Sequence, residues 1–204
     1  IFIVYHQITE LYFKLALREF EQISDKKELT GDFFLDRVTR INRYFEALTK
    51  SFEIMVQGME KEQFLKFRMS LLPASGFQSA QYRLIEMAST DFINLVHKDV
   101  RDQVDLNNTS IADMYQNIYW KEGATELKSG KKTLTLEQFE KRYSKEFIEF
   151  AELQKEKNLW QCYLRLSMDD QNRSDIKQAM KQNDVNVNVN WPLVHYKSAV
   201  RYLQ

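Results

Sequence analysis

The chain has 204 residues, with 29 basic and 29 acidic side chains, so its formal net charge is zero. This balance argues against a nucleic-acid partner or an anionic membrane surface, because no long-range field would attract either one. Two prolines and five glycines are few for this length, whereas 14 Phe and 10 Tyr are many. The composition predicts an all-α protein, a single-domain bundle of long helices packed with aromatic side chains.

A single cysteine, Cys162, excludes an internal disulfide framework and fits a reducing compartment. No apolar run reaches the roughly 18–20 residues that cross a bilayer, and no signal-peptide pattern is present. We therefore expect a cytoplasmic protein that does not enter membranes. The sequence begins inside one helical pattern and stops at Gln204 inside another, so we expect native N- and C-terminal segments beyond both ends.

Residues 1–23 are predicted to form one helix with two apolar stripes. Its stripes repeat at three- and four-residue steps and consist of Ile1, Val4, Ile8, Leu11 and Leu15, and of Phe2, His6, Glu10, Phe13, Leu17 and Phe20. At about 100° per residue the two stripes lie on opposite sides of the helix. We therefore expect this helix to be buried between layers, with His6 facing an apolar space.

Further helices follow in chain order. The second begins at a cap on Thr30 or Asp32 and ends near Gly58. The next predicted segments are a short helix over 60–72, a turn at 73–76, helices over 78–97 and from about 110 to 122, and a surface excursion at 123–134. The capping box Thr135-x-x-Gln138 predicts a long helix to Arg165. Residues 167–190 are polar, with a short helix at 174–181, and Pro192 falls in the first turn of the last helix.

The segment FLKFRMSLLPASGFQSAQYR, residues 64–83, suggests a binding site. A helix carrying Arg68 stops at Pro73, and a new helix starts near Gln78. The backbone N–H groups of that helix start and the two-pronged guanidinium both suit an anionic ligand group. The plainer alternative is an ordinary helix connection, with Arg68 paired to a nearby glutamate.

Three motifs carry a family resemblance. PASGFQSAQYR resembles the PASGFQS-x-Q-[FY]-R motif of the tryptophan 2,3-dioxygenase family, all-helical haem enzymes. FIVYHQITELYFK, residues 2–14, is similar to that family's FI-x-x-HQ-x-x-EL-[WY]-FK, and Trp191 to His195 is similar to its W-x-x-x-H. The resemblance implies one haem dioxygenase-like domain over 1–204 and haem b as cofactor. It also implies opening of the indole C2–C3 bond of L-tryptophan by dioxygen to give N-formyl-L-kynurenine, in a homotetramer.

The resemblance also implies roles for individual residues. His6 is the catalytic distal histidine that contacts the indole N–H, Arg68 holds the substrate carboxylate, and His195 is the axial iron ligand. The residues implied to line the substrate pocket are Phe2, Phe64 and Leu71, and those implied to lie against haem are Ser75, Gly76, Tyr82 and Trp191.

The residues alone leave other interpretations open. A histidine on an apolar helix face, such as His6, is more often a core residue than a catalyst, and Glu10 either orients its ring or caps a buried network. Trp191 and His195 could simply pack a terminal helix against the bundle. His97 is expected at the surface and Cys162 in the core. The alternative functions are a haem oxygenase for another indole derivative and a non-catalytic haem- or ligand-binding helical protein.

Overall fold

The computed structural model describes residues 2–58, 60, 62, 79–124 and 134–203. The helix predicted at 60–72 and the Pro73–Gly76 turn lie almost wholly outside the described residues, as do residues 125–133 of the surface excursion. Across the described ranges the regular elements are helices, and the one strand-like pairing is an isolated bridge between Val96 and Ile118. The prediction of an all-α fold is therefore confirmed.

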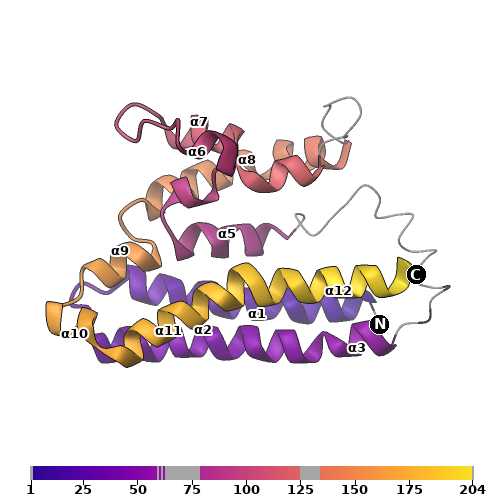
Figure 1. The fold of residues 1–204 in the computed structure, drawn as a ribbon, viewed down its shortest axis with the longest axis horizontal. Helices are drawn as coiled ribbons and strands as arrows, with labels where there is room; N and C mark the ends of the chain where they lie inside the picture. Colours follow the sequence, from indigo (N-terminus) through magenta and orange to yellow (C-terminus); the bar gives the residue numbers. More distant parts are fainter. Residues whose placement is uncertain (1, 59, 61, 63–78, 125–133, 204) are drawn as a thin grey trace. The chain divides into compact units, whose positions relative to one another are not determined.

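The chain divides into two compact units, residues 1–70 with 162–204 and residues 71–161. The single domain expected over 1–204 stays a prediction. The first unit contains α1 (Phe2–Asp25), α2 (Gly31–Ser51), α3 (Glu53–Gly58), α10 (Met168–Asn172), α11 (Ser174–Val185), the π-helical η4 (Asn186–Asn190) and α12 (Trp191–Leu203). Helix α2 packs against α1 on one side and against the α11–η4–α12 run on another, as Figure 1 shows. This packing brings the two ends of the chain into one unit.

Helix α1 is buried on one side only. Its buried stripe repeats at helical steps through Tyr5, Thr9, Phe13, Ala16, Phe20 and Ile23. On the other side Val4 is 60% exposed and Leu11 is 63% exposed. The prediction that α1 is buried between two layers is therefore wrong for the described chain, because the elements that pack on α1 approach it from one direction.

Helix α2 begins where its cap predicts. The hydroxyl of Thr30 accepts from the amide of Phe33 over 3.4 Å, so Thr30 is the N-cap, not Asp32. The helix stops at Ser51 instead of running to Gly58, with Phe52 at a turn before α3. The Ser51 hydroxyl donates to the Leu48 carbonyl over 3.0 Å, a local bond that competes with regular helix continuation.

The polar segment before Trp191 is helical without interruption from Ser174 onward. Helix α11 extends to Val185, beyond the predicted end at Lys181, and continues into the π-turn of η4. The Trp191 amide donates to the Asn186 carbonyl, five residues back. Pro192 has no amide proton, and its ring would clash with a carbonyl four residues earlier in a regular α-helix; the wider turn relieves this. Pro192 lies in the first turn of α12, as predicted.

A buried asparagine cluster joins this run to α2. The side-chain amide of Asn42 donates to the Ala179 carbonyl over 2.9 Å. The amides of Asn183 and Asn186 each donate to the Asn42 oxygen over 3.4 Å. All three asparagines are buried. Because amide bonds are directional, this cluster specifies how the α11–η4 run lies along α2.

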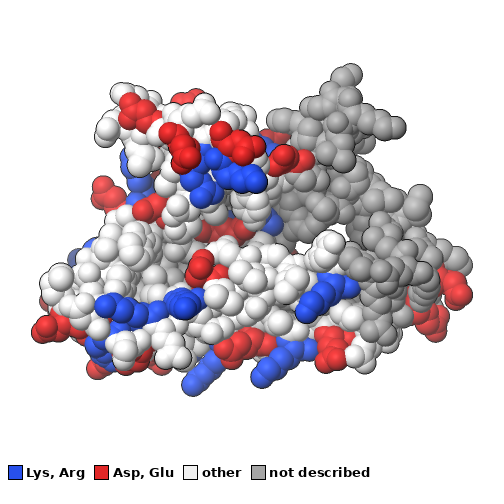
Figure 2. All heavy atoms as spheres, viewed as in Figure 1, with Lys and Arg blue, Asp and Glu red and all other residues white. Residues whose placement is uncertain are grey.

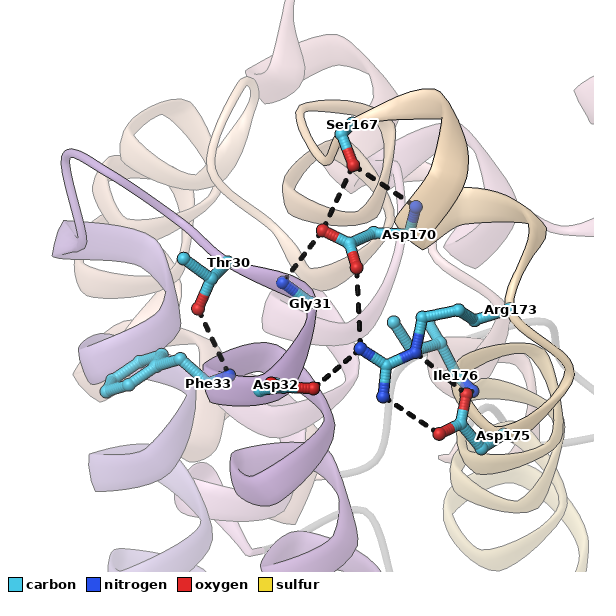
Figure 3. A network of polar contacts seen from close by, with 9 residues as sticks. All are labelled: Thr30, Gly31, Asp32, Phe33, Ser167, Asp170, Arg173, Asp175 and Ile176. Atoms are coloured by element: carbon cyan, nitrogen blue, oxygen red, sulfur yellow. Dashed lines mark hydrogen bonds and ion pairs between the residues drawn. The ribbon is translucent and has the colours of Figure 1, made fainter.

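A second polar network ties the corner before α11 to the start of α2 (Figure 3). Asp170 accepts from the amide of Gly31 over 3.1 Å and from the Ser167 hydroxyl, also over 3.1 Å. The guanidinium of Arg173 bonds Asp32 over 2.6 Å and Asp175 over 2.9 Å. Side chains from both ends of the sequence thus hold this corner together.

The second unit contains α5 (Ala80–Ser89), the 3₁₀ turn η2 (Phe92–Leu95), α6 (Lys98–Arg101), α7 (Ile111–Gln116), η3 (Tyr119–Ala124) and α8 (Leu134–Gln154). Helix α5 packs on α8 over a core that includes Tyr115, Leu136 and Phe147. The helix α9 (Leu159–Leu164) crosses the boundary between the units.

Two predicted helices of this unit are wrong in length. The helix expected over 78–97 ends at Ser89, because Thr90 adopts an extended backbone. The helix expected from Thr135 to Arg165 ends at Gln154, and Thr135 lies inside it and not at its cap. Asn158 starts α9 by accepting from the amide of Gln161, and its side chain donates to Asp91 over 3.0 Å. These breaks follow polar contacts between distant residues, which periodicity does not reveal.

His97 has a structural role beyond the surface position predicted for it. Its Nδ1 accepts from the amide of Asp99 at the start of α6, while its Nε2 faces Glu122. Cys162 is buried, as expected. None of the helices in the described ranges combines the length and apolarity needed to cross a membrane. In Figure 2 basic and acidic side chains are interspersed on the visible face, in keeping with the zero net charge.

Candidate functional site

The candidate site is centred on His195, in the second turn of α12. Its Nδ1 lies 3.1 Å from the carbonyl oxygen of Trp191, one turn earlier. A carbonyl can only accept a hydrogen bond, so Nδ1 carries the proton and donates it. In this tautomer Nε2 has a free lone pair, which is the state in which an imidazole binds a metal.

Aromatic rings surround the His195 imidazole. The Phe52 ring lies 4.4 Å away between centroids, tilted by 43°, and the Trp191 ring lies 4.3 Å away at 68°. Trp191 also makes edge contacts with Phe13 at 5.4 Å and with Phe52 at 5.7 Å. Trp191 and Phe52 are both buried. The imidazole thus lies against an apolar wall drawn from α1, the α2–α3 turn and α12.

This environment keeps His195 neutral. The pKa of His195 is lowered from 6.5 to about 4, mainly by removal from water and to a smaller extent by its electrostatic interaction with His6, whereas the bond to Trp191 opposes the change. His195 is therefore unprotonated at neutral pH. A neutral imidazole with Nε2 free is the form needed for an axial haem ligand, so these residues fit the group that the motifs imply.

His6 belongs to the same unit and lies within electrostatic reach of His195, since its charge affects the pKa of that residue. It is partly buried on α1, and the neighbouring Tyr5 ring meets it edge-on at 6.3 Å. A histidine from the first motif and one from the last thus belong to one unit, and their roles toward haem and substrate stay predictions.

Other predicted site residues are not placed with these two. The residues that lie outside the described part are Phe64, Arg68, Leu71, Ser75 and Gly76, and the side chain of Phe2 is also outside it. Tyr82 belongs to the second unit, where it is buried with the guanidinium of Arg83 4.7 Å from its ring centroid. Their assigned roles stay predictions.

Two aromatic residues near the histidines have no predicted role: Phe52, which contacts His195, and Tyr5, which contacts His6. The Tyr5 ring contacts Phe52 at 5.6 Å, and its hydroxyl lies 2.8 Å from the Ser51 oxygen. The available signal for Tyr5 is its place beside His6 in the first motif, whereas no local pattern marks Phe52, because its contact with His195 is tertiary.

A buried charged cluster in the second unit was also not predicted. Arg83 Nη1 lies 2.7 Å from Glu86 Oε2 and donates to the Tyr119 hydroxyl over 3.0 Å, while that hydroxyl donates to Glu86. Burial raises the pKa of Glu86, and the Arg83 charge opposes this rise. Burial and the Glu86 charge raise the pKa of Tyr119 to about 12. The three-residue spacing from Arg83 to Glu86 on α5 was the available signal.

Comparison with known proteins gives a consistent result. Residues 1–191 match the family model described as tryptophan 2,3-dioxygenase, so the match ends at Trp191 and His195 lies four residues beyond it. The chain is 39% identical over 88 residues to a tryptophan 2,3-dioxygenase of Ruegeria sp. (strain TM1040), covering 42% of this chain and 31% of that protein.

Two further relatives show the same extent of similarity. Identity is 42% over 93 residues to tryptophan 2,3-dioxygenase 2 of Ralstonia nicotianae, covering 43% of this chain and 25% of the relative. The chain is 43% identical over 96 residues to the tryptophan 2,3-dioxygenase of Sorangium cellulosum, and the match covers 43% of this chain and 22% of that protein. The chain thus spans between 22% and 31% of the length of these relatives. No solved structure matches it significantly.

Proposed function

Because the chain belongs to the tryptophan 2,3-dioxygenase family, we propose that it is a haem-dependent dioxygenase acting on L-tryptophan. In the proposed reaction both atoms of dioxygen enter the substrate, the indole C2–C3 bond breaks, and N-formyl-L-kynurenine is formed. The observation that carries the proposal is a neutral His195, whose Nδ1 is held by the Trp191 carbonyl and whose pKa is affected by His6 in the same unit.

His195 would hold the iron through Nε2. The carbonyl of Trp191 keeps the ring proton on Nδ1, so the ligating nitrogen needs no deprotonation before it binds. Phe52 and Trp191 supply an apolar wall that excludes water from this ligand. Haem b, when bound, supplies the centre at which dioxygen is activated.

His6 would position the substrate. A neutral imidazole accepts a hydrogen bond through its unprotonated nitrogen, and the indole N–H of tryptophan is a donor of the right kind. Holding this N–H fixes which edge of the indole ring faces the reaction centre. His6 would thus accelerate the reaction by orienting the substrate and not by transferring a proton. Arg68 would bind the α-carboxylate with its two-pronged guanidinium, and Phe2, Phe64 and Leu71 would enclose the indole.

The resemblance further supports Ser75, Gly76 and Tyr82 as residues beside the haem. It also supports a homotetramer as the active form. The single cysteine fits a protein of the reducing cytoplasm.

The first experiment tests haem binding. The full chain is titrated with haem, and its Soret band is recorded before and after addition of carbon monoxide to the reduced protein. We expect a strong Soret band that shifts with carbon monoxide in the wild type and is lost in His195→Ala. Circular dichroism confirms that the variant is folded, and added imidazole, which can occupy the vacated ligand position, should restore the band. A wild type without a Soret band contradicts the proposal.

The second experiment tests the reaction. Under reducing conditions with L-tryptophan and air, the absorbance of N-formylkynurenine should grow. Arg68→Ala should abolish this signal while retaining the Soret band, because it removes the carboxylate anchor and leaves the iron ligand. His6→Ala should bind haem and turn over slowly. Turnover of another indole but not of tryptophan would indicate the other dioxygenase specificity, and haem binding with no turnover of any indole would indicate a binding protein.

A further inference from the structure

We propose that Phe52 is a positioning residue for His195, holding the imidazole plane in one orientation for its ligand role; the inference rests on the proposed function. Phe52 is 4% exposed and lies at the turn between α2 and α3. Its ring centroid is 4.4 Å from that of His195, at an interplanar angle of 43°.

Phe52 and Trp191 both contact His195, but Phe52 belongs to a different segment of the chain from His195, whereas Trp191 does not. Trp191 lies one turn before His195 on the same helix, so it moves with His195 when α12 moves. Phe52 comes from a segment more than one hundred residues away in the sequence. It therefore fixes the imidazole relative to a part of the first unit other than α12.

The hydrogen bond of His195 is not sufficient for this purpose. One bond from Nδ1 to the Trp191 carbonyl fixes the tautomer but leaves the ring able to pivot about that bond. The tilted Phe52 ring on one part of the imidazole surface and the Trp191 ring at 68° on another restrict this pivot. The plane of an axial imidazole affects its bonding to iron, which is one of the ways a protein tunes a haem.

Phe52 is itself held in place. Its amide donates to the Leu48 carbonyl over 3.0 Å, and its carbonyl accepts from the amides of Met55 at 2.9 Å and Val56 at 3.1 Å. The Tyr5 ring packs edge-on against it at 5.6 Å, and the Tyr5 hydroxyl lies 2.8 Å from the oxygen of the preceding Ser51. The interruption after Ser51 is thus a rigid turn that presents one aromatic ring to His195.

The test measures the iron–histidine stretching band of the reduced, haem-loaded full chain by resonance Raman spectroscopy, and the rate of haem loss to apomyoglobin. In Phe52→Leu we expect a shifted or broadened band and haem loss faster by about tenfold. Phe52→Tyr keeps the aromatic face and should restore the wild-type band. If Phe52→Leu does not fold, Phe52→Met, which fills more of the space, is measured in its place.

Phe45→Leu is the matched control. Phe45 is buried on α2, two turns before Phe52, and its ring packs on Phe13 at 6.0 Å. The Phe45→Leu variant should be less stable than the wild type but should keep the wild-type iron–histidine band and rate of haem loss. A wild-type band in Phe52→Leu, or an equal change in Phe45→Leu, overturns the role of Phe52 while leaving the proposed function intact. Absence of the band in wild-type protein overturns both.

Discussion

The amide of Gly31 donates to Oδ2 of Asp170 over 3.1 Å, across 139 residues of sequence, and a β-carbon on Gly31 would lie 2.1 Å from the other oxygen of that carboxylate. The carboxylate therefore approaches the first residue of α2 more closely than any side chain there would permit. A negative charge at this helix start also interacts favourably with the unpaired amides of the first turn.

We predict that Gly31→Ala destabilises the protein. The added methyl group forces the Asp170 carboxylate away from α2, which should lower the free energy of unfolding by about 1–3 kcal/mol. Urea unfolding followed by circular dichroism measures this change. Gly58→Ala is the control, because its new β-carbon would meet nothing nearer than Ile54 at 3.9 Å, an ordinary contact.

A double substitution identifies the cause. Asp170→Ala removes both the hydrogen bond and the obstructing oxygen. In the Asp170→Ala background, Gly31→Ala should therefore change the free energy of unfolding only slightly. If the losses from the two substitutions simply add, steric conflict with Asp170 is not the reason for the effect.

Asn42 should be the least replaceable residue of the asparagine cluster. Asn42→Ala leaves the amides of Asn183 and Asn186 without the oxygen they share, and buried polar groups without partners are costly. We expect a loss of about 2–3 kcal/mol in the free energy of unfolding. Asn188→Ala, at an exposed residue bonded to Asp184, should change stability by less than about 0.5 kcal/mol. Equal effects at the two positions would contradict a special role for Asn42.

Replacing one member of the buried Arg83–Glu86 pair on α5 should destabilise the protein more than replacing both members. Arg83→Met strands the Glu86 carboxylate in the interior and should cost about 3–5 kcal/mol, whereas Arg83→Met with Glu86→Leu should recover much of that loss. Chemical unfolding of the two variants tests this ordering. A double variant less stable than Arg83→Met would show that the pair stabilises the second unit beyond mutual neutralisation.

The stability of Arg83→Met should also depend on pH differently from the stability of the wild type. The pKa of Glu86 is already raised above 4.5 by burial, and loss of the opposing Arg83 charge raises it further. Between 4.5 and the raised folded pKa the folded state binds more protons than the unfolded state, so stability falls as the pH rises. The deficit of Arg83→Met should therefore shrink as the pH falls toward 4.5, which urea unfolding at a series of pH values measures. A deficit that grows under acid would contradict the assignment.

In haem-free protein, His195 should make the folded state less stable as the pH falls, which is opposite to the effect of Glu86. Its folded pKa of about 4 lies below the ordinary value of 6.5, so the unfolded chain takes up the proton first. The associated stability is complete above pH 6.5 and is lost as the pH falls toward 4, with an upper limit of about 3 kcal/mol. His195→Phe should lose this part of the acid transition in thermal melts from pH 7 to 4. An unchanged pH profile in His195→Phe would show that His195 is not the group responsible.

The sequence by itself determined the helical class, the start of α2 at Thr30 or Asp32, the position of Pro192 and the two histidine motifs. These features depend on local rules: the periodicity of apolar residues, the hydrogen bonds of caps and short motif spacing. The sequence did not reveal where the helices break, because the breaks at Phe52, Thr90 and residues 155–158 accompany polar and aromatic contacts whose partners are elsewhere in the chain.

Only the tertiary structure decided that α1 is covered on one side, that Phe52 meets His195, and that Arg83 and Glu86 are buried together. Periodicity shows which residues can share a helix face but not whether another element covers that face. The neutral state of His195 likewise depends on water excluded by rings from three segments, and no local pattern encodes a desolvation that several distant segments produce together.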